Sequence, residues 1–247
     1  MISQAIGKIK GFIGRQKRNY RVGVERASAN SFLTGLTSQY SAIYTVGLGA
    51  DSVQLGSISS VGSAISALIS TPVGWLVDRY GIKWFYLLSI LLMAGGSLTR
   101  AAARDWRFLI LATILASVAT RLSGTGCRVI SADSVQNEDR VTAQNVCGTL
   151  GSLAGMIAPL LAAYLVTLFG GMTVEGIRPL YYLQFVGYGL VLLMVALQLR
   201  EPRRERLVAP GTRLGFILDF RRLFETRRGL GRWIALSALT SLPLAMY

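Results

Sequence analysis

Residues 74–83 read GWLVDRYGIK and stand between two long apolar segments of the chain. This stretch holds two glycines and three charged residues, namely Gly74, Asp78, Arg79, Gly81 and Lys83. Because it is so short, it predicts a tight reversal between two helices, and Gly81 has the backbone freedom for that turn. The two apolar segments are therefore expected to be antiparallel neighbours. Gly74 is small enough to let a further helix approach closely.

The composition of the chain is that of a membrane protein. Of its 247 residues, 52% are hydrophobic and 15% are charged, and the mean hydropathy is +0.47. Water-soluble domains carry nearer about 25% charged residues. A net charge of +14 is also found in nucleic-acid-binding proteins, but nearly all the basic residues here lie outside the apolar segments. We therefore expect the lipid bilayer as the partner of this charge, and no nucleic acid.

The residue types that carry most enzyme chemistry are scarce. The chain contains no histidine, which excludes histidine-based catalysis and histidine-ligated metal sites. Its two cysteines, Cys127 and Cys147, are too few for a disulfide framework or a thiolate metal site and are interpreted as small packing residues. No acidic residue lies within the long apolar segments. We therefore expect no enzyme activity, no cofactor and no metal.

The apolar segments have the length of membrane-spanning helices. A bilayer core of roughly 30 Å needs about 20 helical residues to cross it. Six segments approach this length: 30–48, 55–77, 84–99, 108–126, 146–169 and 180–199. A seventh begins near Gly231, but Trp233 to Tyr247 is only 15 residues, or about 22 Å of helix. The sequence predicts an all-α membrane protein, a six-helix bundle with a partial seventh transmembrane helix.

The segments between the predicted spans are basic, and they suggest four parts. These are a basic N-terminal segment (1–29), the six-helix transmembrane bundle (30–199), a basic linker with an amphipathic helix (200–230) and the truncated start of a second bundle (231–247). The N-terminal segment lacks the continuous apolar stretch of a cleavable signal peptide.

The distribution of lysine and arginine predicts the orientation. Outside the six spans, 21 of these residues would lie on the side of the N-terminus and four on the other side. Because cytoplasmic loops carry the excess of positive charge, the N-terminus and residues 74–83 are expected in the cytoplasm. The protein is then a multi-pass protein of the plasma membrane, which in a bacterium is the inner membrane.

The stretch GWLVDRYGIK resembles the loop between helices two and three of the major facilitator superfamily, whose pattern is G-x-L-x-D-R-x-G-R/K-R/K. The matching residues are Gly74, Leu76, Asp78, Arg79, Gly81 and Lys83. The match follows the second of six spans, on the side predicted to be cytoplasmic. Residues 48–56 and 132–143 are similar to the family's outer loop before helix two and to its loop between helices four and five. The resemblance covers about 20–247, the N-terminal half of such a protein and the start of helix seven.

The resemblance implies a major facilitator-type bundle and a role for the loop. In that family the loop contacts the second six-helix bundle and helps to hold the outward-facing state. Asp78 would be the acceptor of this contact, with Arg79 and Lys83 as its cationic partners. The second bundle is missing from this chain.

The fifth predicted span is rich in small residues, and two compatible interpretations apply. Gly148, Gly151, Gly155 and Pro159 resemble the glycine- and proline-rich helix five of exporter members of the family. Small residues also allow a neighbouring helix to pack closely.

A polar stripe runs along the first predicted span. Its residues recur at helical spacing on one face: Asn30, Thr34, Thr37, Ser38, Ser41 and Thr45. Within a membrane such a face meets protein or water, so these residues are candidates for lining a substrate cavity. Hydrogen bonds between helices are the alternative for each of them.

Arg121 is the one charged residue within the six predicted spans. A charge there costs roughly 2.5–3.5 kcal/mol even on the lenient insertion scale, so Arg121 should face a cavity or a partner. Ser117 and Thr125 lie one turn to either side and are cavity candidates with it. The family often has a functional arginine in helix four. The alternative is that Arg121 extends its long side chain to the cytoplasmic surface.

Together these features predict a secondary active transporter that moves a small solute by alternating access. The chain would be incomplete and contain the first half only. Since no acid lies within the spans, coupling could use the missing half or boundary acids such as Asp78, or the protein could be a uniporter. The alternative is a non-transporting seven-helix membrane receptor or assembly protein.

Overall fold

The computed structural model of the chain describes residues 18–80, 82–135 and 139–199. All of them belong to one compact unit, Met1–Pro202. The predicted linker and the start of the second bundle lie outside the described residues, as does most of the predicted N-terminal segment.

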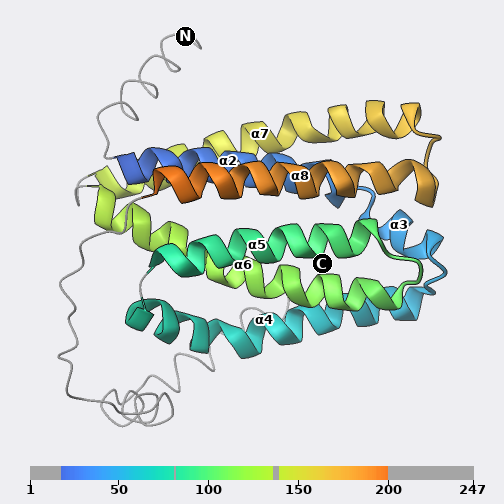
Figure 1. Cartoon of the computed structure of the whole chain (residues 1–247), viewed down its shortest axis with the longest axis horizontal. Coiled ribbons are helices and arrows are strands. Elements are labelled where there is room, and N and C mark those ends of the chain that lie inside the picture. The colour runs from blue at the N-terminus through green and yellow to red at the C-terminus, as the bar shows by residue number, and fades with distance from the viewer. Residues whose placement is uncertain (1–17, 81, 136–138, 200–247) are drawn as a thin grey trace. The chain divides into compact units, whose positions relative to one another are not determined.

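The described part of the chain is entirely helical. Its seven helices are α2 (Arg18–Ser38), α3 (Ser41–Gly47), α4 (Ser52–Tyr80), α5 (Ile82–Ala101), α6 (Arg107–Ser134), α7 (Arg140–Leu168) and α8 (Val174–Gln198). The longer helices, α2 and α4 to α8, run side by side, and the short α3 lies at one end of them (Figure 1). Five of these helices, α4 to α8, contain stretches long and apolar enough to cross a membrane. This confirms the predicted all-α membrane fold.

The first predicted span differs from the expectation in two ways. It begins at Arg18, twelve residues before position 30, and it is divided by a turn at Gln39 and Tyr40 into α2 and α3. Arg18, Arg21 and Glu25 are exposed and recur on one face of α2. Their charges lower the mean hydropathy of this segment, so a search for apolar segments does not detect the start of the helix.

The rest of the surface of this early part of α2 is largely buried. The side chains of Tyr20, Val22 and Val24 lie in the protein interior, and the Tyr20 hydroxyl donates a hydrogen bond to the Ala143 carbonyl oxygen of α7 at 2.8 Å. The helix is therefore stabilised by tertiary packing rather than by its own apolar character.

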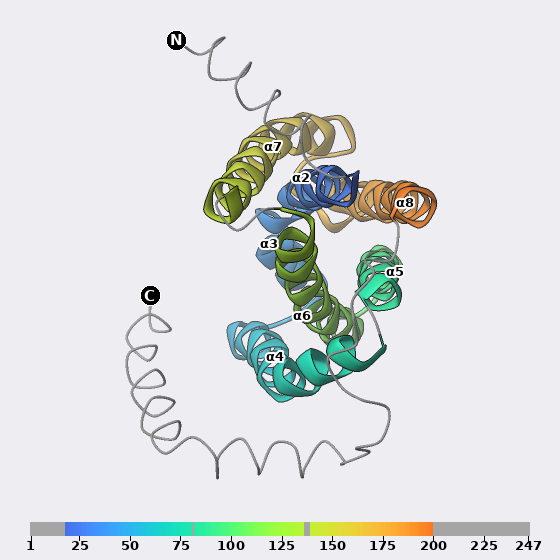
Figure 2. The ribbon, with the colours of Figure 1, turned by 90° about the vertical axis from the view of Figure 1, so that its left-hand side faces the viewer.

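Seen along the helices, α2 lies between α7 and α8, and α6 lies between α4 and α5 (Figure 2). Helix α5 also packs against α8 and joins the two groups. The helices that flank residues 74–83 were expected to be antiparallel neighbours. They are antiparallel and touch, but α4 packs mainly on α6 and only slightly on α5. A short connection holds only the ends of two helices close together. Along its length, α4 packs on the helix that fits against its small residues, such as Gly62. A Cβ placed on Gly62 would lie 2.8 Å from the Thr113 Cγ2 of α6.

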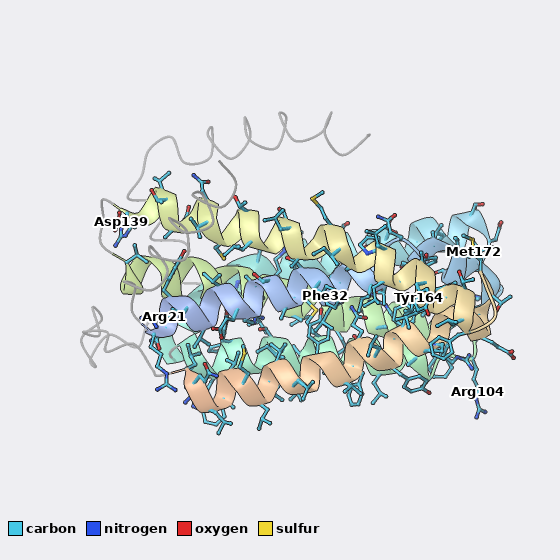
Figure 3. The ribbon with its side chains drawn as sticks, turned by 90° about the horizontal axis from the view of Figure 1, so that it is seen from above. Arg21, Phe32, Arg104, Asp139, Tyr164 and Met172 are labelled. Carbon is cyan, nitrogen blue, oxygen red and sulfur yellow. The ribbon has the colours of Figure 1, made fainter. Side chains whose placement is uncertain are left out.

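The bundle has two ends, which Figure 3 identifies by labelled residues. Arg21 and Asp139 lie at one end, where α2 and α7 begin. Arg104 and Met172 lie at the opposite end, in the α5–α6 and α7–α8 connections. The first is called the amino end below and the second the far end.

The outer surfaces of α7 and α8 are apolar. Large hydrophobic side chains are exposed there along several turns: Leu160, Tyr164, Leu168, Leu190, Leu193 and Leu197. A contiguous apolar surface of this kind on long helices is suited to a bilayer rather than to water.

Helices α2 and α7 approach each other closely along small residues. A Cβ placed on Gly35 would lie 2.9 Å from the Ala158 Cβ and 3.1 Å from the Gly155 carbonyl oxygen. A Cβ on Gly151 would lie 3.1 Å from the Ser31 Oγ. By contrast, Gly148 faces open space, and Pro159 is half-buried within α7. Of the predicted small residues, Gly151 and Gly155 are therefore those that meet α2, and Gly35 is a partner that the sequence did not single out.

Gly35→Leu is expected to destabilise the bundle by about 1–3 kcal/mol, because the new side chain meets backbone and a fixed Cβ rather than a movable side chain. The measurement is the midpoint of thermal unfolding of the purified protein in detergent. Gly148→Leu is the matched control and should leave the midpoint unchanged or raise it, since a leucine favours helix over glycine. Equal losses in both variants would contradict close α2–α7 packing.

Candidate functional site

The residues of the polar stripe of the first span lie in several different environments. Near the middle of α2, the Tyr188 hydroxyl of α8 donates a hydrogen bond to the Asn30 Oδ1 at 3.2 Å, and it lies 3.2 Å from the Thr34 Oγ1. Tyr188 is only 2% exposed. These two stripe residues therefore form hydrogen bonds between helices, which was the alternative to lining a cavity, and Thr34 is at the same time exposed at the surface.

A second polar connection lies beside the first. The Ser97 hydroxyl of α5 donates to the Gln184 Oε1 at 3.1 Å, and the Gln184 Nε2 donates to the Leu33 carbonyl oxygen of α2 at 3.0 Å. Gln184 is 4% exposed, so its amide is satisfied within the protein. The connection joins three helices. In the sequence, Gln184 and Tyr188 are polar side chains one turn apart near the middle of a mostly apolar span.

The remaining stripe residues differ in exposure. Thr37 and Thr45 are buried and donate to carbonyl oxygens of their own helical segments, those of Thr34 at 3.4 Å and Ser41 at 2.7 Å. Ser38 is exposed on the surface of α2.

Arg26 is a buried charged residue that the sequence did not single out. It was expected in a basic segment outside the bundle, but its side chain is 3% exposed within it. Its Nη1 donates to the Ser123 Oγ of α6 at 2.6 Å, and its Nη2 donates to the Ser89 Oγ of α5 at 2.8 Å. The guanidinium carbon lies 4.0 Å from the centroid of the Tyr86 ring, a cation–π contact.

The Arg26 side chain ties three helices together without a carboxylate. Among the residues that the structure describes, no acid pairs with it, and its buried Nε has no hydrogen-bond partner. A buried arginine so placed depends on its two serines and on the aromatic ring for compensation of its charge. Arg26 lies four residues before Asn30, so extending the polar stripe backwards by one turn would have found it.

A cavity of about 220 Å³ lies toward the far end of the bundle. Its walls come from α3, α4, α5, α6 and α8, and they include two of the predicted stripe residues, Ser41 and Thr45. The other lining residues are Tyr44, Leu55, Ile58, Ser59, Arg100, Leu109, Thr113 and Tyr181.

Two buried tyrosines shape this cavity. The Tyr44 hydroxyl donates to the Arg100 carbonyl oxygen at 2.7 Å, which fixes the end of α5 against α3. The Tyr44 and Tyr181 rings lie with their centroids 4.9 Å apart and tilted by 51°. This is a favourable aromatic geometry that holds α3 against α8.

Arg121 is exposed at the surface of α6. The helix has 28 residues, or about 42 Å, and Arg121 is about 20 Å from either end. Of its two predicted companions, Ser117 lies in the contact between α4 and α6, where its Oγ would be 3.2 Å from a Cβ on Gly62. The side chain of Thr125 lies outside the described residues.

The residues of the GWLVDRYGIK stretch gather at the amino end. Gly74, Asp78 and Arg79 belong to the last turns of α4, and Lys83 belongs to the first turn of α5. Gly81, between the two helices, lies outside the described residues. The side chains of Asp78 and Arg79 are not described either, whereas that of Lys83 is. Asp78 stands near a helix C-terminus, where the macrodipole disfavours a carboxylate.

In the described residues, no group of histidine, cysteine, aspartate or glutamate side chains could hold a metal ion. The polar groups instead form helix-joining contacts in the interior, a cavity at the far end, and exposed positions on α2 and α6.

Comparison with known proteins gives one family. A family model described as Major Facilitator Superfamily matches residues 27–247. Among curated proteins, the putative multidrug resistance protein MdtD of Yersinia pseudotuberculosis and that of Yersinia pestis are each 29% identical over 100 residues. The matched stretch is 40% of this chain and 22% of each relative.

Solved structures share the fold. A POT family transporter in complex with a thioalcohol-conjugated peptide has a TM-score of 0.61 and 18% identity, over 93% of this chain and 46% of that one. A mutant of the peptide transporter POT in complex with sulfate has a TM-score of 0.56 and 17% identity, over 91% of this chain and 45% of that one. The chain thus spans about half the length of these structures.

Proposed function

Because the chain belongs to the major facilitator superfamily, we propose that it is the first half of a secondary active transporter, which moves a small solute by alternating access. The family assignment predicted from residues 74–83 is confirmed by the family match. The solved neighbours are transporters and not enzymes. The names of the relatives, which refer to multidrug resistance and to peptide transport, favour a small organic solute.

The observation that carries this proposal is the exposed polar surface of two adjacent helices. Helix α2 exposes Thr34 and Ser38, and its neighbour α6 exposes Arg121 far from either helix end. A charge at such a position facing lipid would cost roughly 2.5–3.5 kcal/mol. These surfaces are therefore suited to a water-filled pathway between this bundle and a second one, rather than to the bilayer.

The proposed orientation puts the amino end of the bundle in the cytoplasm. Outside the spans, 21 lysine and arginine residues lie on this side and four on the other. Since Arg26 is buried in the bundle, it no longer counts as a loop residue, and the larger number falls only to 20. The four arginines of the opposite side, including Arg104, are accompanied by Asp51, Asp105 and Glu175. Asp78, Arg79 and Lys83 would then form a cytoplasmic gate with the second bundle.

Alternating access predicts that Ser38 is reached by water from both sides of the membrane in turn. The test is Ser38→Cys in the complete transporter, with Cys127 and Cys147 replaced by serine. A membrane-impermeant thiol reagent should modify the new cysteine both in right-side-out and in inverted vesicles, because a thiolate forms only where water reaches it.

Leu190→Cys is the control, since Leu190 is 65% exposed on the apolar surface of α8 and should face lipid. It should react slowly from both sides. Modification of Ser38→Cys from one side only would argue against alternating access and favour the receptor or assembly alternative. A rate no higher than that of Leu190→Cys would place Ser38 away from any aqueous pathway.

A further inference from the structure

The far-end cavity is partly open and is formed by helices of this bundle alone. It is distinct from the exposed surfaces of α2 and α6 that carry the proposed transport pathway. Five helices contribute to its walls, and neither Thr34, Ser38 nor Arg121 does so. Its 220 Å³ correspond to about seven water molecules in the liquid. This is enough space for a small organic molecule.

One part of the cavity wall is cationic and rich in hydroxyl groups. Arg100 lines it, and its guanidinium is near enough to the Tyr181 phenol for an electrostatic interaction. No acid in the described part of the chain forms an ion pair with Arg100. Thr113 also lines the cavity, and its hydroxyl can donate a hydrogen bond.

Another part of the wall is apolar. It is formed by Leu55 and Ile58 of α4 and by Leu109 of α6. An inorganic ion would leave these side chains without a partner, whereas an organic ligand would cover them.

A second guanidinium, that of Arg178, lies behind the cavity wall beside Tyr44 and donates to the Ala103 carbonyl oxygen at 2.7 Å, and it does not line the cavity. Arg100 is therefore the one guanidinium among the lining residues, and it matches a single negative charge better than the two charges of a phosphate monoester.

We propose that this cavity binds a small organic monocarboxylate. The carboxylate lies against Arg100 with a hydrogen bond from Thr113, and the apolar part of the ligand lies against Leu55, Ile58 and Leu109. Guanidinium and carboxylate match in geometry and can form two parallel hydrogen bonds. The site does not depend on the proposed transport function, and binding to it can be measured without any solute flux.

Benzoate is the probe, because it joins one carboxylate to one compact apolar group. The experiment is equilibrium dialysis of radiolabelled benzoate against the purified chain in lipid nanodiscs, with empty nanodiscs subtracted. Saturable binding of one benzoate per chain is expected. Unlabelled benzoate should compete, whereas benzamide, which has the same shape but no charge, should not.

Arg100→Gln should weaken benzoate binding at least tenfold. The matched control is Arg104→Gln, since Arg104 is exposed at the same end of the bundle and does not line the cavity. It should leave the affinity unchanged. If Arg100→Gln fails to fold, Thr113→Val tests the same site with almost no change in shape, and it should weaken binding by about threefold to tenfold.

Three results would overturn the proposal. The first is the absence of saturable binding, as expected for a cavity that holds only water. The second is an equal loss in the Arg100 and Arg104 variants, which would indicate a general charge effect at the surface. The third is unchanged affinity in folded Arg100→Gln or in folded Thr113→Val. Elution volume and circular dichroism establish that each variant is folded.

Discussion

Replacing Arg26 by alanine is expected to lower the free energy of unfolding of the bundle by about 3 kcal/mol. The variant removes two hydrogen bonds that join α2 to α5 and α6, the contact with the Tyr86 ring, and a long buried side chain. The Ser89 hydroxyl keeps its bond to the Tyr86 carbonyl oxygen at 2.7 Å, so the loss falls mainly on the packing between helices. Equilibrium unfolding of the purified protein in mixed micelles measures it.

Three further variants separate the contributions to this loss. Arg18→Ala, on the exposed face of the same helix, should change the stability by less than about 0.5 kcal/mol. Arg26→Lys keeps the charge but cannot reach both serines and should also be destabilising. Arg26→Met retains length without a buried charge and should be the best tolerated. If Arg26→Ala is as stable as Arg18→Ala, the Arg26 contacts do not hold the bundle together.

Asp78→Asn is expected to shift the complete transporter away from its outward-facing state. On the proposed orientation, the ratio of cytoplasmic to external labelling rates at Ser38→Cys should rise at least tenfold. This is because the loss of one charged contact to the second bundle is worth about 1.4 kcal/mol or more. The labelling assay needs no knowledge of the transported solute, which makes this measurement possible before the substrate is identified.

The matched control for this variant is Asp51→Asn, at an exposed acid of the far end. It should leave the labelling ratio unchanged, while Asp78→Asn should still insert into the membrane at normal levels. An unaltered ratio in Asp78→Asn would remove the proposed gate and would leave residues 74–83 as an ordinary polar turn. A shift in both variants would indicate a general effect of acidic residues on insertion.

Much of the fold could be predicted because hydropathy and charge are local properties of the chain. The stretches of α4 to α8 that are suited to crossing a membrane overlap the predicted spans, and their ends differ from the predicted ones by one to seven residues. The family could be predicted as well, because the GWLVDRYGIK pattern combines residue types with a fixed place in the order of spans. Neither inference required knowledge of which helix packs on which.

The first helix shows where this reasoning fails. Its charged residues Arg18, Arg21 and Glu25 lower the average over any window, although they share one exposed face. Whether the opposite face is buried depends on α7, and specifically on contacts such as that of Tyr20 with Ala143. A window average cannot represent such a pairwise property, so the helix was expected to begin at residue 30.

The candidate site also combines features that the sequence could show with contacts that it could not. The polar stripe, the small residues of α7 and the isolated Arg121 were visible as patterns within single helices. The sequence could not show that Asn30 and Thr34 meet Tyr188, or that Ser41 and Thr45 share a cavity with Arg100. These partners come from helices far apart in the chain.

The sequence by itself therefore determined that this is an all-helical membrane protein of the major facilitator superfamily, with its spans in their approximate places. Only the tertiary structure decided that α6 separates α4 from α5, that Gly35 meets α7, and that Arg26 is buried among serines. The physical reason is that the free energy of placing a segment in the bilayer is a sum over its own residues. Burial and packing depend instead on the facing surfaces of other helices.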